Sequence, residues 1–204
     1  LTYNELVSSL IHFLEVAFHS ILHLRHVYPP SIFSLHRSYQ IPVHRSRHPG
    51  LNEYISSILT AVREELDKDD DEQAGGVHKI IFVLSSASTG KTLERYIFEL
   101  AHLLPRTLRR ADRDLSIRGN VSFRQVQLYY RAFLMKLVVL DAALEEVHDE
   151  EDLTFAVDGE VHDDSQELRA RRSAAEGKDN DEPIILPVKT LDSGVINLML
   201  YVED

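Results

Sequence analysis

The stretch VSFRQVQLYYRAFLMKLVVLDAALEEV, residues 121–147, contains neither glycine nor proline and carries apolar side chains on nearly every side of a helical period. A helix that is apolar all round has no face for water, so we expect the rest of the domain to wrap around it. Ser122 and Gln125 have the spacing of a capping box, which marks the start of this helix. Arg131 and Lys136 carry charge in its middle. Both can extend to the surface, or Arg131 can belong to a partner interface, where arginine is enriched.

The composition describes an acidic globular chain without cysteine. Its 204 residues fit one domain, the apolar share is 44%, and the net charge is −11. This charge disfavours broad contact with phosphate backbones, although the basic stretch RTLRRADR at 106–113 could touch nucleic acid. The absence of cysteine removes disulfides, thiolate catalysis and cysteine-ligated zinc. No signal peptide or membrane span is expected.

The remaining elements are predicted from caps and periodicity. Thr2 and Glu5 form a second capping box, which opens a helix that we expect to run to about Tyr28. Another amphipathic helix covers 51–62, and 31–49 is expected to be an irregular basic arm. Alternating apolar residues predict strands at 79–84, 93–100, 153–157, 184–188 and 195–202. Helices with a mostly antiparallel set of strands indicate the α+β class.

Three histidines of the first helix share one face: His19, His23 and His26. No carboxylate or cysteine follows at a matching spacing, so we expect no metal site there.

The segment SSASTGKT at 85–92 follows a strand and resembles a phosphate-binding loop. A P-loop needs G-x-x-x-x-G-K-[ST] between a strand and a helix, and Gly90-Lys91-Thr92 fits its second half. Ser85 stands where the first glycine is required, and the residues that follow alternate as a strand. We therefore expect a hairpin turn, with a small P-loop nucleotide enzyme as the alternative.

The last strand has two different apolar faces. Alternation places four side chains on a core face: Ile196, Leu198, Leu200 and Val202. The opposite face carries Met199 and Tyr201, beside Ile185 and Leu186 on the neighbouring strand. This second face is either an exposed apolar patch, which usually marks a partner site, or it is covered by another element.

Four blocks of the chain resemble, in the same order, the HORMA-domain accessory subunits of DNA polymerase zeta: FLEVAFHSILHLRHVYPPSIF (13–33), IPVHRSRHPGLNEYI (41–55), RAFLMKL (131–137) and PVKTLDSGVINLMLYVE (187–203). The resemblance spans Leu6 to Glu203 and weakens at three insertions, which suggests a divergent member such as a fungal one: 67–78, 101–120 and 158–182.

The resemblance implies an α+β HORMA fold, in which three helices pack on an antiparallel sheet and a C-terminal safety belt closes over a partner peptide. It implies a single HORMA domain over residues 1–204, with a core at 1–157 and a safety-belt region at 158–204. Members are similar in being non-catalytic adaptors, so neither enzyme activity nor a cofactor or metal is expected.

The partners implied by the resemblance are proteins. Members trap a proline-containing peptide of the catalytic subunit of polymerase zeta under the belt. They also bind the C-terminal domain of a Y-family polymerase on the belt's outer face, and some pair with other HORMA domains as homodimers or heterodimers. These contacts imply a nuclear adaptor in translesion DNA synthesis that meets nucleic acid mainly through its partners and does not bind a membrane.

The resemblance also assigns site residues. Tyr54 matches a tyrosine of the peptide groove, and Arg131 and Ala142 match the HORMA dimer interface. The Y-family polymerase surface would include Ile185, Leu186, Met199 and Tyr201. A belt tryptophan of vertebrate members has no counterpart, because the chain contains no tryptophan.

Three alternatives stay open at this point. One is the P-loop enzyme that would use Gly90-Lys91-Thr92, and another is direct DNA binding through Arg106 to Arg113. The third is a HORMA adaptor that acts mainly in break repair or checkpoint signalling.

Overall fold

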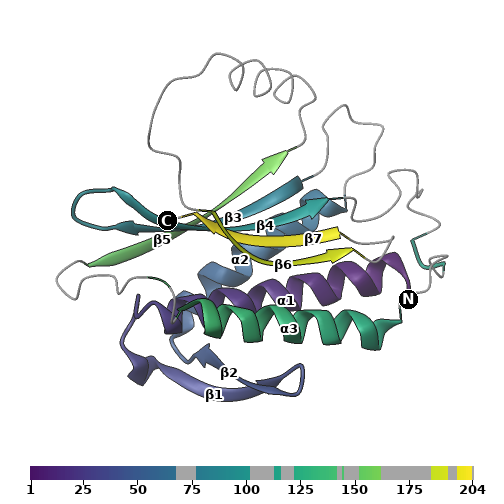
Figure 1. The fold of residues 1–204 in the computed structure, drawn as a ribbon, viewed down its shortest axis with the longest axis horizontal. Coiled ribbons are helices and arrows are strands. Elements are labelled where there is room, and N and C mark those ends of the chain that lie inside the picture. The colour runs from purple at the N-terminus through teal and green to yellow at the C-terminus, as the bar shows by residue number, and fades with distance from the viewer. Residues whose placement is uncertain are drawn as a thin grey trace, which may run out of the picture.

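A computed structural model describes residues 1–67, 77–101, 113–115, 122–141, 144, 152–161, 185–192 and 197–203. Three helices lie on one face of a five-stranded antiparallel sheet, and a two-stranded hairpin packs against the helices from the other side (Figure 1). The helices are α1 (Tyr3–Leu24), α2 (Pro49–Leu66) and α3 (Phe123–Asp141), with a short 3-10 helix at Pro30–Ile32. The strands are β1 (Phe33–Ser38), β2 (Ile41–Ser46), β3 (Val77–Ser86), β4 (Thr92–Ala101), β5 (Leu153–Val161), β6 (Ile185–Asp192) and β7 (Asn197–Glu203). The predicted α+β class is confirmed.

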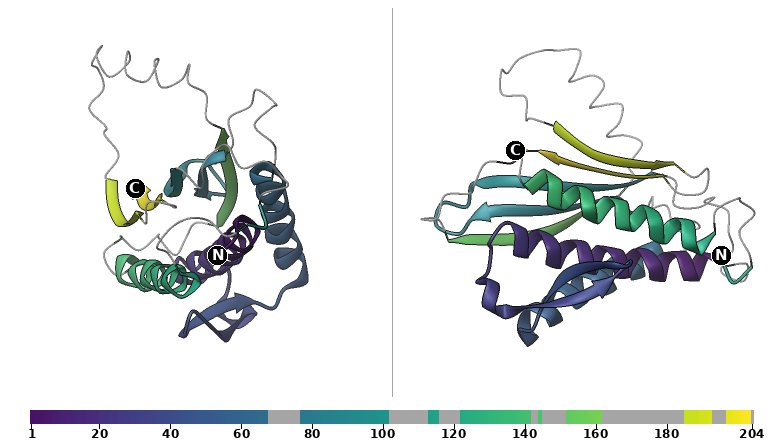
Figure 2. Two further views of the ribbon diagram at one scale, coloured as in Figure 1. Left: turned by 90° about the vertical axis from the view of Figure 1, so that its right-hand side faces the viewer. Right: turned by 60° about the horizontal axis from the view of Figure 1, so that its bottom comes forward.

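Helix α1 lies at the centre of the helical layer. Twelve of its 22 residues are buried, and it contacts α2, α3 and β2 as well as the sheet (Figure 2). The predicted capping box opens it, since Glu5 N–H donates to Thr2 Oγ1 at 3.2 Å and Thr2 N–H donates to Glu5 Oε2 at 2.9 Å. By length and composition α1 could cross a membrane, but its apolar side chains lie in the core of this domain.

The enclosed helix is therefore α1, and the prediction that residues 121–147 form it was wrong. Helix α3 ends at Asp141 and buries one stripe: Val126, Tyr130, Phe133, Leu134 and Leu137. Its other side leaves five large apolar residues exposed to solvent: Phe123, Leu128, Met135, Val138 and Val139. The N-terminal part of the prediction was correct, because Ser122 N–H donates to Gln125 Oε1 at 2.8 Å in the predicted capping box.

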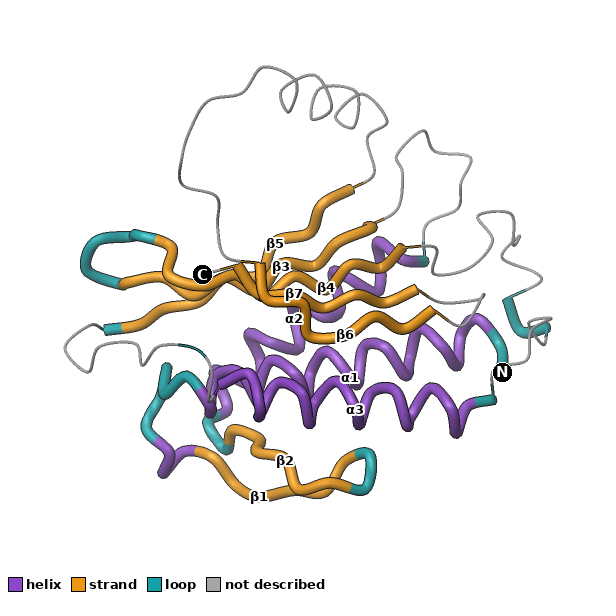
Figure 3. The backbone as a smooth tube through the Cα atoms, viewed as in Figure 1, coloured by secondary structure: helices purple, strands orange, loops and turns teal. Residues whose placement is uncertain are grey.

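The sheet has the strand order β5-β3-β4-β7-β6, with every neighbouring pair antiparallel. The β3–β4 hairpin was correctly predicted, and the register pairs Ile80 with Phe98 and Phe82 with Tyr96. These four side chains are buried against the helices. The backbone tube shows β5 and β6 at opposite edges of the sheet, although they are consecutive in the chain (Figure 3).

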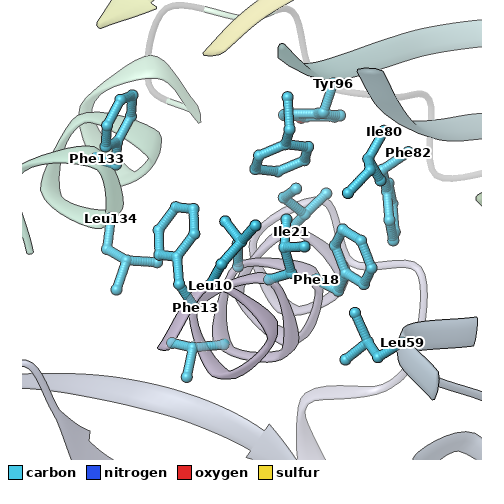
Figure 4. Close-up of a cluster of buried hydrophobic side chains, with 14 of the residues drawn as sticks. Leu10, Phe13, Phe18, Ile21, Leu59, Ile80, Phe82, Tyr96, Phe133 and Leu134 are labelled. Carbon is cyan, nitrogen blue, oxygen red and sulfur yellow. The ribbon is translucent and has the colours of Figure 1, made fainter. Parts of the chain in front are cut away.

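Aromatic side chains join the layers (Figure 4). Phe13 of α1 stacks on Tyr130 of α3, with ring centroids 4.4 Å apart and planes 11° apart. The ring centroid of Phe18, on the same helix, lies 5.1 Å from that of Phe82 on β3 and 5.8 Å from that of Phe98 on β4. Packed aromatic pairs of this kind contribute specific geometry as well as buried area. Together they fix the position of α1 between α3 and the sheet.

A buried ion pair closes one end of this core. The guanidinium of Arg25, the residue that follows α1, binds the carboxylate of Glu94, and their side chains are 5% and 3% exposed. Arg25 Nη1 also lies 3.2 Å from Asp141 Oδ1 at the end of α3, and Tyr96 Oη donates to Glu94 Oε2 at 2.8 Å. Burial alone would lower the pKa of Arg25, but the charge and hydrogen bonds of Glu94 and Asp141 hold that pKa above its usual value. The group therefore joins α1, β4 and α3.

The helix that was predicted to reach Tyr28 stops at Leu24. His26 has φ of 53°, a left-handed conformation that a helix does not contain. The chain turns there, so Arg25 can point into the core toward Glu94.

The arm at 31–49 was predicted to be irregular with strand-like pieces around Ile32-Phe33 and Tyr39 to Val43, and it is a more regular hairpin. It contains β1 and β2, which pair in register from Phe33–Ser46 to Ser38–Ile41. Tyr39 and Gln40 join the strands with φ of 49° and 63°, the combination that a two-residue type I′ turn requires. Glycine and asparagine usually occupy such positions, so this sequence gives no ordinary hairpin signal.

The histidines of α1 face this hairpin. His19 is buried and accepts a hydrogen bond from Ser46 N–H at 3.5 Å, while His23 stacks on His44 with ring centroids 3.7 Å apart. Burial, then Arg45 and His36, lower the pKa of His19 to about 4. No group of three metal-binding side chains occurs among the described residues.

The Phe13→Ala variant tests the aromatic junction. We expect it to lower the free energy of unfolding by about 3–5 kcal/mol, because it leaves a cavity between α1, α3 and the sheet. Urea denaturation measures this loss. Val139→Ala, at a side chain that is 70% exposed, is the matched control and should change stability by less than about 0.5 kcal/mol. Equal losses in the two variants would contradict the packing described here.

The low pKa of His19 predicts a pH dependence of stability. The folded chain keeps the imidazole neutral down to about pH 4, whereas in the unfolded chain it titrates near its ordinary 6.5. The unfolded chain therefore binds more protons in this window, so stability falls as the pH drops from about 6.5 to about 4. Melting temperatures between pH 7 and 5 should fall more steeply for the parent chain than for His19→Leu. His26→Asn, at an exposed histidine, should retain the parent's slope.

Candidate functional site

One edge of the sheet is formed by β5, which pairs with β3 on one side and with no other described strand. Its nine residues alternate, with Phe155 buried against the helices and Thr154 and Ala156 exposed. A strand at a sheet edge presents unpaired N–H and C=O groups, which can pair with an added chain. The edge is therefore a template for one more strand.

Aromatic side chains from two other segments gather at this edge. Tyr54, on α2, is 45% exposed, and its ring meets that of Phe155 edge-on, with centroids 5.4 Å apart. Tyr28, from the segment after α1, meets the same ring at 6.5 Å. Burial, then the neighbouring Tyr54, raise the pKa of Tyr28, so the Tyr28 phenol stays a neutral hydrogen-bond donor around pH 7.

Phe155 itself is held firmly in place. It stacks on Phe82 of β3, with centroids 5.2 Å apart and planes 12° apart. The two tyrosines thus rest on a buried aromatic base, while part of Tyr54 faces solvent. A free strand edge with adjoining aromatic side chains is suited to an extended peptide, whose backbone pairs with β5 and whose side chains contact the rings.

The sequence pointed to Tyr54 but missed Tyr28 and Phe155. The alternation of 153–157 placed Phe155 on an inward face without showing which helix it would meet. Tyr28 follows the end of α1, where periodicity gives no information.

The proposed second surface lies at the opposite edge of the sheet. Met199 pairs in register with Glu99, and Tyr201 pairs with Ile97 and Pro187. Residues that are paired across antiparallel strands share a face. Because Phe98 and Leu100 of β4 face the helices, the positions of Met199 and Tyr201 belong to the opposite face, which carries no helix among the described residues and is called the helix-free face below.

The same register separates the two neighbouring positions on β6. Ile185 pairs with Glu203, which pairs with Arg95, so its position belongs to the helix-free face. Leu186 pairs with Val202, which pairs with Tyr96, and so belongs to the helix side. The register thus brings Ile185, Met199 and Tyr201 together, and the role of all four residues stays a prediction.

The proposed dimer residues concern α3. Arg131 is partly buried and lies between Leu128 and Met135 at helical spacing, so it shares their exposed apolar stripe. No ion pair of Arg131 occurs among the described residues. Ala142 lies outside the described residues.

The P-loop alternative is wrong. Gly90-Lys91-Thr92 lies in the tight turn between β3 and β4, where Gly90 N–H donates to Ser86 O and Ser86 N–H donates to Lys91 O, each at 2.9 Å. Thr92 begins a strand, whereas a P-loop requires a helix there.

The basic stretch Arg106 to Arg113 is described only at its last residue. Arg113 is buried, donates from Nη1 to Asp67 O at 2.8 Å and lies over the Tyr3 ring at 5.1 Å. Its guanidinium is therefore occupied inside the domain. The rest of this proposed DNA contact, at 106–112, lies outside the described residues.

Comparison with known proteins shows similarity along nearly the whole chain. The family model described as HORMA domain matches residues 7–159. The human mitotic spindle assembly checkpoint protein MAD2B is 31% identical, over 100% of this chain and 93% of the relative. The DNA polymerase zeta processivity subunits of Schizosaccharomyces pombe and Arabidopsis thaliana are 28% and 26% identical, over 94% and 98% of this chain and 89% and 86% of theirs.

Solved structures share the fold at lower sequence identity. A chain in the crystal structure of the mitotic checkpoint complex matches with a TM-score of 0.68 and 19% identity, over 97% of each chain. Caenorhabditis elegans HTP-2 bound to the HIM-3 closure motif matches with a TM-score of 0.64 and 14% identity, over 97% of this chain and 89% of that one.

Proposed function

Because this chain belongs to the HORMA domain family, we propose that it is a non-catalytic adaptor in translesion DNA synthesis. In this role it captures a proline-containing peptide of the catalytic subunit of DNA polymerase zeta and bridges it to a Y-family polymerase. Relatives from a fungus and a plant are named as processivity subunits of that polymerase, which supports the assignment. Such partners imply action in the nucleus and indirect contact with DNA.

The observation that carries the proposal is the free edge of β5 beside the exposed ring of Tyr54. A peptide added to β5 gains backbone hydrogen bonds along nine residues of strand. The rings of Tyr28 and Tyr54 offer flat apolar surfaces with polar tips, and proline packs well on such surfaces.

The strand order supports a safety belt made of residues 158–204. The chain leaves β5 at one edge and resumes with β6 at the other, so the belt region begins beside the peptide edge and ends beside β4. In this proposal the belt closes over the bound peptide. Escape then requires local unfolding of β6 and β7, which slows dissociation far more than it slows encounter.

The second partner, the C-terminal domain of the Y-family polymerase, binds the helix-free face near β7. This surface includes Ile185, Leu186, Met199 and Tyr201, of which three occupy register positions on one face. It lies across the sheet from β5, so both partners can be held at once.

A third contact is a HORMA dimer through α3. The exposed stripe with Leu128, Met135 and Val138 has no cover among the described residues, and an apolar stripe of this kind usually marks a partner surface. Arg131 lies on the stripe, and Ala142 is proposed to extend it.

A role in checkpoint signalling or break repair is the second candidate. It is favoured because vertebrate relatives that match 100% of this chain over 93% of their own length are named as spindle assembly checkpoint proteins. The same peptide edge would serve this role with a different peptide.

Calorimetry and dissociation kinetics against a proline-containing peptide of the organism's own polymerase zeta test the proposal directly. Tight binding with dissociation over hours is the expected result. Absence of binding by a chain with a cooperative melting transition would overturn it.

Two tyrosine variants separate the two partner surfaces. Tyr54→Ala should weaken peptide capture by about tenfold or more, since it removes a ring at the peptide edge. Tyr201→Ala should leave peptide capture unchanged and should instead weaken binding of the C-terminal domain of the Y-family polymerase. Tyr54→Phe keeps the ring and should lose little of the affinity for the peptide. If Tyr201→Ala abolished capture while the second partner still bound, the assignment of the two surfaces would be wrong.

Arg131→Ala should reduce self-association without lowering the melting temperature, because Arg131 lies on the exposed stripe of α3 and forms no ion pair among the described residues. Sedimentation velocity at rising concentration measures the effect. Lys136→Ala, an exposed charge on another side of the same helix, serves as the control. Unchanged sedimentation of Arg131→Ala would count against the dimer interface.

A further inference from the structure

A second concave site lies away from the peptide edge. An open pocket of about 930 Å³ is lined by residues from the N-terminal ends of α1 and α3 and from the turn of the β1–β2 hairpin. None of the described residues that line it comes from α2, β5, β6 or β7. Pockets of this volume accommodate a few side chains of a ligand. The proposed capture of a peptide under the safety belt does not use this pocket.

The hairpin rim of the pocket is held in a strained conformation. Tyr39 and Gln40 both have positive φ, a conformation that is unfavourable for residues other than glycine. Tyr39 Oη and His12 Nδ1 are 2.8 Å apart, and the Tyr39 ring meets that of Tyr130 edge-on at 5.6 Å. These contacts fix the turn, and with it the neighbouring Arg37, against α1 and α3.

Most polar groups on the α1 side of the pocket are already engaged. Glu5 accepts the Thr2 N–H at 2.9 Å, and Ser8 accepts from Arg63 Nη2 at 2.9 Å. Asn4 Nδ2 donates to Asp114 Oδ1 at 2.6 Å. The hydroxyl and amide groups there therefore have few hydrogen bonds left to offer a charged ligand.

The unused charge at the pocket is on the hairpin. Residues 33–48 contain three arginines and three histidines and no acidic residue, in a chain of net charge −11. Arg45 is paired with Glu15 at 2.7 Å, and Arg47 donates to Ser31 O at 2.6 Å. Arg37 is exposed and has neither an ion pair nor a hydrogen bond among the described residues.

An exposed apolar residue lines the same pocket as this cation. Phe123, at the start of α3, is 46% exposed. A guanidinium binds a carboxylate through two parallel hydrogen bonds, and an exposed ring gains from burial by an apolar side chain. The pocket therefore matches a ligand that carries an acid next to a large apolar group.

We propose that this pocket is a docking site for an acidic peptide segment of a partner protein, with its carboxylate on Arg37 and its apolar side chain on Phe123. The site is separate from the β5 edge and does not depend on the proposed capture of a polymerase peptide. Nucleic acid fits less well, because Arg37 is the single lysine or arginine among the described residues that line the pocket, whereas a phosphate backbone is bound through several cations.

The test uses the full chain, isotope-labelled for amide NMR, and the peptide acetyl-Gly-Asp-Phe-Glu-Phe-Gly-amide. A neutral twin carries Asn and Gln in place of the acids. The expected result is saturable shifts of the amides of Ser38, Tyr39 and Gln127 with the acidic peptide, much weaker with the twin and reduced by salt.

Matched charge reversals locate the anion. Arg37→Glu should weaken binding by about tenfold or more, since it places a like charge against the peptide acid. Arg45→Glu, the same change on the adjoining strand, should weaken binding less than about threefold. Melting temperatures of both variants verify that they are folded.

Several outcomes would overturn the proposal. One is the absence of a saturable shift with the acidic peptide. Another is an equal loss of peptide affinity in Arg37→Glu and Arg45→Glu, which would indicate diffuse attraction to the hairpin. Shifts confined to β5 would place binding at the peptide edge. Binding of a phosphoserine peptide at the pocket without binding of the Asp/Glu peptide would assign it to phosphorylated partners instead.

Discussion

Enclosure of α1 is the constraint on which the rest of this structure depends. The helix has the sheet on one side, α2 and α3 beside it and the β1–β2 hairpin on the remaining side. Phe13 and Phe18 make the aromatic contacts to α3 and to the sheet, and Arg25 carries the buried charge that joins the end of α1 to β4 and α3. All three described helices lie on one face of the sheet, so no described helix covers the other face or extends β5 at its edge (Figure 2).

This distribution explains where partners can bind. A sheet with helices on one face has edges, and natural proteins pair, cover or charge such edges to avoid uncontrolled association. Here β5 has aromatic side chains from α2 and from the segment after α1 beside its free edge, which favours one kind of addition, an extended peptide. The proposed peptide site therefore lies at the strand edge that the described residues leave unpaired.

Much of the fold could be predicted from the sequence, because local rules decided it. The capping boxes at Thr2 and Ser122 and the β3–β4 hairpin follow from short-range spacing, and the missing glycine at Ser85 correctly argued against a P-loop. The relative burial of α1 and α3 could not be predicted in this way. Apolar residues on α3 look the same in sequence whether they face a core or a partner, and the polar side of α1 is covered by a hairpin whose Tyr39-Gln40 turn carries no glycine signal.

At the candidate site, too, some features could be predicted from the sequence and others depended on the tertiary structure. Tyr54 was identified through family resemblance, whereas its contact with Phe155 depends on how α2 lies beside β5, which no local pattern encodes. Glu94 occupies an inward position among apolar residues of β4, and its partners Arg25 and Asp141 lie far away in the chain. A buried acid could be suspected from alternation alone, but its partners required the tertiary structure.

The pairing of β4 with β7 has a consequence for the synthesis of this protein. Strand β4 ends at Ala101, and its partner spans Asn197–Glu203, so one side of β4 waits for its neighbour while most of the later chain is made. At ordinary elongation rates this interval lasts roughly 5–20 seconds. An apolar strand with an open edge is prone to aggregation during that time. The nascent domain is therefore expected to depend on chaperones until β7 has been made and has paired with β4.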